Sequence, residues 1–103
     1  ETIVNIEGNY PNFGNFHHNN RFLIFEKLVD GYRDLSNDLE NTIRVKFNCT
    51  IDGLNFNSQF IIDKNDDEII ERLNTVYIPF YEQYEEYEVC DEIREIYKKI
   101  KGI

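Results

Sequence analysis

Residues 42–63, TIRVKFNCTIDGLNFNSQFIID, decide the fold because two alternating stretches flank a dipeptide that favours a tight turn. Apolar or small side chains occupy every second position from Ile43 to Ile51, and again from Leu54 to Ile62. Such alternation is typical of strands that are buried on one face. Asp52-Gly53 is a preferred pair for the type I′ turn, which joins two antiparallel strands through two residues. The sequence therefore predicts a β-hairpin over residues 42–62.

The turn also fixes the register of this hairpin. A two-residue turn sets Cys49 opposite Phe56 and Val45 opposite Phe60, so the apolar side chains of both strands share one face. The other face is polar and is expected to contact solvent. Because Cys49 lies on the apolar face, we expect it to be a buried free thiol.

A hairpin of this kind is not stable alone, and helices on both sides of it in the sequence can cover it. Apolar residues recur at helical spacing within residues 21–40, after a candidate N-cap at Asn20. Residues 65–101 predict two to three acidic helices, which start near Asp66, end or kink at Pro79, and stop before Gly102. The predicted fold class is α+β, with an antiparallel hairpin packed against an N-terminal helix and these C-terminal helices.

The first twenty residues form a third part of the single predicted domain, which spans residues 1–103. Residues 1–7 alternate weakly and are a candidate third strand at the sheet edge. Residues 8–20 contain five Asn, two Gly and one Pro, so we expect a loop-like, Asn-rich arm whose aromatic side chains pin it to the body. The chain is long enough for one domain and too short for two.

The sequence contains no pattern that indicates catalysis, a cofactor or a metal. It has no Gly-rich phosphate loop and no nucleophile motif. Cys49 and Cys90 lie 41 positions apart, and the adjacent pair His17-His18 has no neighbouring ligand at a metal-site spacing. We therefore expect a protein that is not an enzyme, uses no cofactor and works by binding.

The negative charge is concentrated in one third of the chain. Of a formal net charge of −9, all of it arises between Asp63 and Glu95, where twelve acidic residues face three basic ones. On the predicted helices, carboxylates three or four positions apart lie roughly 5–6 Å from one another, which is of the same order as the phosphate spacing of a nucleic acid strand. We expect folding to gather them, with nearby tyrosines, into one outward surface that a basic groove can accept. The candidate partner-binding residues are Asp67, Glu68, Glu71, Glu82, Glu85, Glu86, Glu88, Asp91, Glu92 and Glu95, with Tyr81, Tyr84 and Tyr87.

The layout of residues 41–95 resembles that of small acidic anti-CRISPR proteins of phages, of the type that inhibits Cas9 by mimicking DNA. The resemblance rests on the hairpin NTIRVKFNCTIDGLNFNSQFIID, the amphipathic helix after it and the acidic run EQYEEYEVCDE. It implies an inhibitor that occupies the basic nucleic-acid-binding site of a target protein, such as a Cas nuclease, in the cytoplasm of a bacterial host. The Asn-rich arm at 8–20 departs from the family layout.

Three other functions remain open from the sequence, and the first of them, an enzyme without a recognisable motif, would need a pocket with convergent carboxylates of perturbed pKa. An immunity protein against a basic toxin or nuclease would use the same electrostatics. A structural or accessory interaction module would carry the acidic face only for solubility. We expect neither direct binding of nucleic acid, because its phosphates would meet carboxylates, nor a membrane span. Because the sequence starts at Glu1, a removed signal peptide and secretion stay open as well.

Overall fold

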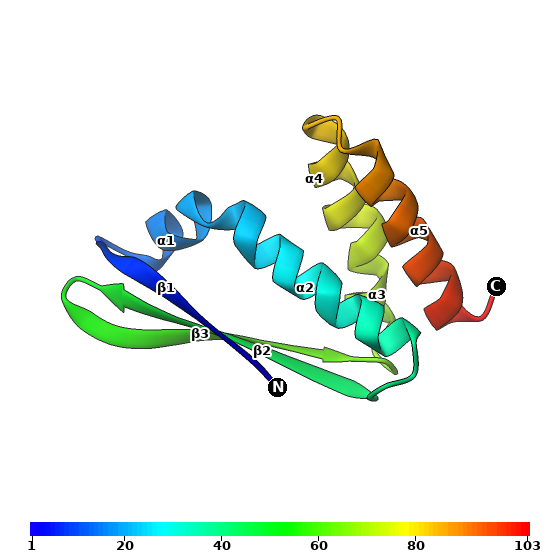
Figure 1. The fold of residues 1–103 in the computed structure, drawn as a ribbon, viewed down its shortest axis with the longest axis horizontal. Helices are drawn as coiled ribbons and strands as arrows, with labels where there is room; N and C mark the ends of the chain where they lie inside the picture. The colour runs from blue at the N-terminus through cyan, green and yellow to red at the C-terminus, as the bar shows by residue number, and fades with distance from the viewer.

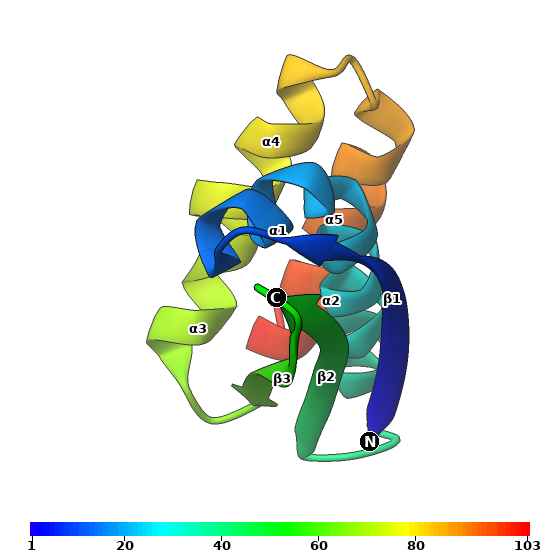
Figure 2. The ribbon, with the colours of Figure 1, turned by 90° about the vertical axis from the view of Figure 1, so that its left-hand side faces the viewer.

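The computed structural model describes all of residues 1–103, and it shows an α+β fold in two layers. One layer is a mixed three-stranded sheet with the strand order β1-β2-β3. The other layer consists of helices that cover one face of that sheet (Figures 1 and 2). The predicted fold class is confirmed.

The predicted hairpin is present with the predicted register. β2 spans Thr42–Ile51 and β3 spans Leu54–Asp63, and in their antiparallel ladder Cys49 lies opposite Phe56 and Val45 opposite Phe60. Asp52 and Gly53 have φ angles of 50° and 78°. Positive φ at both central residues is what a type I′ turn requires. The local turn chemistry therefore sets the strand pairing of the whole hairpin.

The third strand is also present, and it is longer than the predicted residues 1–7. β1 spans Thr2–Tyr10 and pairs with β2 in parallel. Its register shifts between Asn5 and Asn9, where Gly8 has a φ of 111° that side-chain-bearing residues rarely adopt. A parallel neighbour needs a long crossover connection, which the next two helices supply.

The prediction that residues 8–20 form a loop-like arm is wrong. Their first residues belong to β1, and α1 forms a two-turn helix over Phe13–Asn19. The Asn12 side chain caps this helix by accepting a hydrogen bond from the Asn15 N–H at 2.7 Å. Phe16 is fully buried, with its ring edge-on to Tyr10 at 5.3 Å between centroids. One buried aromatic residue and one cap thus hold a helix too short to show a periodic pattern.

α2 spans Arg21–Ser36, as the spacing of its apolar residues predicts. Asn20 stands at its N-cap position, but its side-chain amide donates to the Phe16 carbonyl at 2.8 Å and does not cap α2. Gly31 is buried where α2 crosses β2. A Cβ atom added there would lie 3.0 Å from Ile43 Cγ2. The glycine therefore permits close packing of the helix on the sheet.

The C-terminal helices form two antiparallel columns. The first column contains α3 (Asp67–Arg72), the π-helical segment η1 (Leu73–Tyr77) and α4 (Ile78–Gln83), and the second is α5 (Tyr87–Lys101). Pro79 does not end the first helix, as one of the two predicted alternatives has it, because the helix continues to Gln83; the other alternative, a kink at Pro79, stays a prediction. Pro79 has no N–H and its ring crowds the carbonyl four residues earlier. The wider η1 turn, in which the Ile78 N–H donates to the Leu73 carbonyl, precedes the proline and accommodates it.

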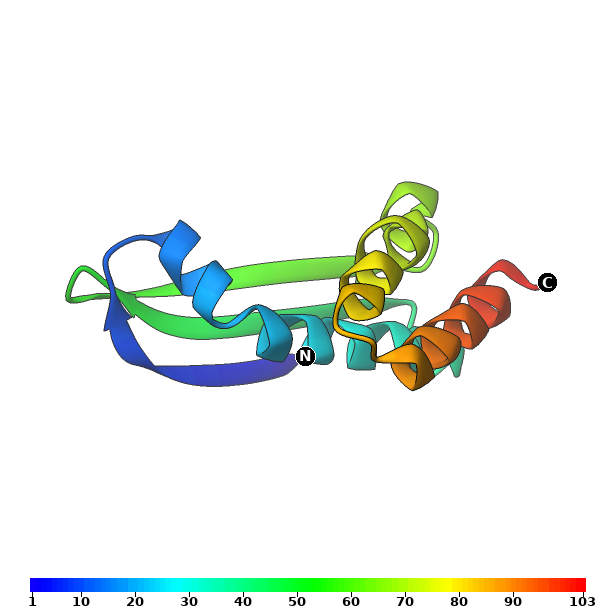
Figure 3. The same cartoon turned by 90° about the horizontal axis from the view of Figure 1, so that it is seen from above.

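The core lies between the sheet and the helices, and it contains both cysteines as buried free thiols. The apolar face of β2 is buried throughout, as predicted. At the hairpin turn the same face of β3 is exposed: Leu54 is 62 % and Phe56 42 % exposed. Figures 1 and 3 show the reason, because the hairpin turn extends beyond the end of the helical layer. The prediction that these two residues are core positions is therefore wrong.

Candidate functional site

The ten candidate carboxylates do not form one continuous surface. Eight of them fall into two groups at opposite ends of α5, which as a fifteen-residue helix is roughly 22 Å long, and Glu92 and Glu95 lie along α5 between the two groups. One group lies at the start of α3, beside the C-terminal end of α5. The other lies around the turn between α4 and α5, at the far end of the helical layer from the sheet (Figure 1).

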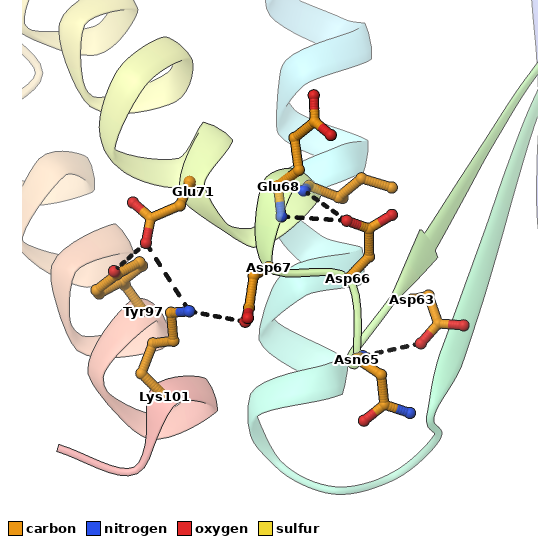
Figure 4. Close-up of polar contacts among 9 residues, drawn as sticks. Asp63, Asn65, Asp66, Asp67, Glu68, Glu71, Tyr97 and Lys101 are labelled. Atoms are coloured by element: carbon orange, nitrogen blue, oxygen red, sulfur yellow. Dashed lines mark hydrogen bonds and ion pairs between the residues drawn. The ribbon is translucent and has the colours of Figure 1, made fainter.

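The carboxylates at the start of α3 are mostly engaged within the molecule (Figure 4). Lys101 Nζ lies 2.8 Å from Asp67 Oδ1 and 3.8 Å from Glu71 Oε1. The Tyr97 hydroxyl donates to Glu71 Oε1 at 2.6 Å, and this bond raises the Tyr97 pKa. The hydrogen bond to Asp67 likewise raises the Lys101 pKa. These contacts join α3 to α5, so Asp67 and Glu71 have a structural role.

The same region contains two carboxylates with different surroundings. Asp66 Oδ1 accepts hydrogen bonds from the N–H groups of Glu68 and Ile69, and it thereby caps α3 (Figure 4). Glu68 is exposed and forms no ion pair. Asp66, like Glu68, has no basic side chain within ion-pair distance, and Lys101 offsets only one of the two charges of Asp67 and Glu71, so this end also keeps an excess of negative charge.

The turn between α4 and α5 presents the second group, which we call the acidic tip. It consists of the exposed carboxylates of Glu82, Glu85, Glu86, Glu88 and Asp91. Arg94 is the one basic residue bonded to them, at 2.9 Å from Asp91 and 4.0 Å from Glu82. The other three carboxylates have no basic side chain within ion-pair distance. The acidic tip therefore carries a marked excess of negative charge.

The backbone of the acidic tip is held in one conformation. Glu85 has a φ of 59°, a left-handed conformation that is uncommon for residues with a side chain. The Glu85 N–H donates to the Glu82 carbonyl at 3.0 Å, and the Glu86 N–H donates to the Tyr81 carbonyl at 2.9 Å. Two hydrogen bonds across the turn thus hold its backbone, from which the exposed Glu side chains extend.

The remaining candidates on α5 lie in ion pairs along its exposed face. Glu92 Oε2 lies 3.0 Å from Arg33 Nη2 of α2, and Glu95 Oε1 lies 3.6 Å from Lys98 Nζ. All four side chains are at least 41 % exposed, so solvent screens these pairs. They reduce the net charge of this face and leave the acidic tip as the more negative region.

The three candidate tyrosines have different environments. Tyr81, expected among the contact residues, is only 7 % exposed, and we therefore leave it out of the candidate surface. Its burial, with the charges of Glu26 and Asp30 nearby, raises its pKa to about 12. Tyr84 is half exposed and packs edge-on against Phe22 at 4.6 Å between ring centroids, whereas Tyr87 is exposed. Tyr84 and Tyr87 thus add aromatic contact area beside the carboxylates.

Sequence reasoning missed two acidic residues of α2 that lie near the acidic tip. Glu26 and Asp30 line a shallow hollow of about 300 Å³ together with Tyr81 and Glu92. Asp30 also pairs with Arg33 at 2.7 Å. Their spacing of four residues on one helix face was the available signal, whereas the count of charges along the sequence points only to residues 63–95. The contact between α2 and α5 that brings them to the tip is a tertiary feature.

The metal-ligating side chains of the protein do not cluster, and both of its thiols are buried. No three His, Cys, Asp or Glu side chains lie together in a way that could hold a metal ion. Burial raises the pKa of both thiols, Cys49 and Cys90, which disfavours the reactive thiolate. His17 is partly buried, with Nε2 3.1 Å from Ser58 Oγ. None of the helices has the length and apolar character that a membrane crossing requires.

Comparison of the chain with protein-family models, with curated proteins and with solved structures finds no match. The resemblance to the anti-CRISPR layout therefore stays a prediction, and the functional argument depends on the geometry of the surface itself.

Proposed function

We propose that this protein is a small acidic inhibitor that binds the basic nucleic-acid-binding groove of a target protein as a mimic of DNA or RNA. The observation that supports this most directly is the acidic tip, where Glu85, Glu86 and Glu88 are exposed and free of basic partners. The sequence predicts a contact surface spread over all the C-terminal helices, and the proposal restricts this surface to the acidic tip.

Electrostatics favours a basic protein groove over other partners. The chain has a net charge of −9, so it repels nucleic acid and attracts cationic surfaces. A groove that binds phosphates presents Lys and Arg side chains, and the same side chains can form ion pairs with the carboxylates of the acidic tip. Because the backbone of the turn is already ordered, the conformational entropy lost on binding comes mainly from the Glu side chains.

The exposed aromatic rings of the acidic tip add contact area, and with it binding free energy that the charges alone do not provide. Exposed charge pairs contribute roughly 0.2–1 kcal/mol each, which is too little for stable binding by a few contacts. Tyr84 and Tyr87 flank the carboxylates, and tyrosine is enriched in protein interfaces because it adds contact area with a polar hydroxyl. The resemblance noted above makes a Cas nuclease the first target to test.

The experiment is capture of target proteins from a bacterial lysate with the immobilised chain, followed by a binding assay on the captured protein. The test variant is Glu85→Gln/Glu86→Gln/Glu88→Gln. The control variant is Glu7→Gln/Asp34→Asn/Glu40→Gln, which removes the same charge from exposed positions outside the acidic tip that form no ion pair.

We expect the tip variant to bind roughly tenfold more weakly, since three exposed pairs at about 0.5 kcal/mol each sum to about 1.5 kcal/mol. Binding by the wild type is expected to weaken between 0.1 M and 1 M salt, as the Debye length falls from about 10 Å to about 3 Å. The bound protein is also expected to release the chain when DNA or RNA is added. Equal loss in the two variants, or a target that binds no nucleic acid, contradicts the proposal.

A further inference from the structure

β3 forms one edge of the sheet, and its outer side has no hydrogen-bonding partner. Its ladder with β2 runs without interruption from the Thr42–Asp63 pair to the Ile51–Leu54 pair. In a hairpin closed by a two-residue turn, alternate residues starting with Leu54 bond to the other strand. The N–H and C=O groups that point away from β2 therefore belong to Asn55, Asn57, Gln59 and Ile61. All four residues are exposed, and none takes part in the main-chain hydrogen bonds outside the helices and the sheet.

Between Leu54 and Ile62 this edge has no charged residue, no proline and no bulge, three of the features by which proteins prevent strand pairing. Free edges are usually protected by charged residues, by proline, by a bulge or by a covering segment. Residues 54–62 contain no charged residue, no proline and no glycine, although the chain has a net charge of −9. The opposite edge, β1, has both Glu7 and an irregular register at Gly8. Only the β3 edge is regular and free of charge.

We propose that β3 pairs with β3 of a second copy of this chain, antiparallel and about a two-fold axis, to form a six-stranded sheet. Two-fold dimers are the commonest homo-oligomers, and a two-fold axis requires a surface that is complementary to itself. The four outward-facing residues are centred on Ser58. Placing the axis there pairs Asn57 with Gln59 of the second copy, and Asn55 with Ile61 of the second copy. All four residues are then used on each strand, with about eight main-chain hydrogen bonds in total.

The same register covers the apolar side chains that the fold leaves exposed. Phe56, which is 42 % exposed although it packs edge-on against Phe13, comes directly opposite Phe60 of the second copy. This is a non-hydrogen-bonded pair, where side chains approach most closely. Phe60 lines a largely apolar groove of about 620 Å³ beside η1, together with Phe25 and the 41 % exposed Val76. In the dimer, Phe56 of each copy would therefore pack against Phe60 and the apolar groove of the other copy.

The dimer does not depend on the function proposed above. The acidic tip lies at the end of the helical layer that is farthest from the sheet, so strand pairing leaves it accessible (Figure 1). Failure of one proposal leaves the other standing.

The first test is sedimentation velocity of the full chain from about 5 µM to about 500 µM, a range that covers the micromolar affinities of small interfaces. We expect a reversible monomer–dimer equilibrium. A chain that stays monomeric at the highest concentration overturns the proposal.

Charge exchange on the edge then tests which strand is involved. Asn57→Lys/Gln59→Lys and Asn57→Glu/Gln59→Glu each place like charges opposite one another across the two-fold, so each variant alone is expected to be monomeric. Their mixture places Lys opposite Glu at both positions, and we expect it to form a heterodimer. The control Thr2→Lys/Ile3→Lys puts the same charge on exposed residues of β1 and is expected to dimerise like the wild type. A mixture that stays monomeric, or a control that also loses the dimer, overturns the proposal.

A disulfide tests the register. The axis brings the two Ser58 Cα atoms to about 4.5 Å, within the range that a disulfide can bridge. We expect Ser58→Cys to form covalent dimers in oxidised glutathione, while Asn55→Cys does not, since the two Asn55 residues lie at opposite ends of the paired strands. Cys49 and Cys90 are buried and do not interfere. Cross-linking by Asn55→Cys in place of Ser58→Cys contradicts this register.

Discussion

Phe16→Ala tests the element that was hardest to foresee, the short helix α1. Phe16 is fully buried between Tyr10 and the sheet, whereas Phe13 in the same helix is 40 % exposed. Burying a Phe side chain contributes about 1.5–3 kcal/mol, and the cavity left by truncation adds to the loss, so Phe→Ala in a core costs about 3–5 kcal/mol. A domain of this size has a free energy of unfolding of only about 5–15 kcal/mol. The substitution therefore removes a large part of the total stability.

The assay is equilibrium urea unfolding followed by circular dichroism, with Phe13→Ala as the matched control. We expect the unfolding free energy to fall by about 3–5 kcal/mol for Phe16→Ala and by less than about 1.5 kcal/mol for Phe13→Ala. For about 100 residues the first value corresponds to a melting temperature lower by roughly 15–30 °C. If the two variants lose equal stability, α1 is not docked through Phe16 and the reasoning is refuted.

Three further predictions concern stability. Burial raises the Tyr81 pKa from 10.0 to about 12, so between these pH values the folded protein keeps a proton that the unfolded chain loses. The contribution of Tyr81 to stability is therefore complete below pH 10 and falls as the pH rises toward 12. Urea midpoints measured at pH 8, 10 and 11 should fall less steeply for Tyr81→Phe than for the wild type. Gly31→Ala is expected to lower the melting temperature measured by differential scanning calorimetry, although Ala has the better helix propensity, because the new methyl group meets Ile43. An unchanged or higher melting temperature would mean that α2 can move away from β2. Tyr32→Phe is expected to lower the unfolding free energy in urea by about 1–2 kcal/mol, because the buried hydroxyl donates to the Ile69 carbonyl at 2.9 Å, and no loss would show that water replaces the bond.

The hairpin and the long helices could be predicted from the sequence because their signals are local. The alternation of β2 and β3 and the turn Asp52-Gly53 specify one register without reference to the rest of the chain. The apolar spacing within α2 and α5 likewise reports which face is buried. These elements have the lengths at which a periodic pattern becomes distinct.

The errors concern features that depend on contacts between elements. α1 spans seven residues, too few for a pattern, and it is held by the packing of Phe16. The helix passes Pro79 because η1 widens ahead of it, which depends on local geometry that propensity does not describe. Leu54 and Phe56 alternate like core residues, but the hairpin turn extends beyond the helical layer, and Phe56 stays 42 % exposed although Phe13 of α1 packs against it.

The candidate site was predicted in part for the same reason. Charge counting located the acidic third of the chain correctly, but it could not show which carboxylates fold next to a base. Lys101 meets Asp67 across two helices, 34 positions away in the sequence. Glu85, Glu86 and Glu88, by contrast, have no basic side chain within ion-pair distance.

The distribution of charge has a consequence for the two proposed surfaces. A molecule with nine excess negative charges resists self-association, unless the contact is made where those charges are absent. The β3 edge is the regular, uncharged stretch that meets this condition, and the acidic tip at the other end of the fold concentrates the charge that attracts a different partner. Because the surfaces share no residue, substitutions in one should leave the other unaffected. The lysine variant of β3 should therefore still capture the target, and the glutamine variant of the tip should still dimerise. Loss of both properties in either variant would show that the two surfaces are coupled through the fold.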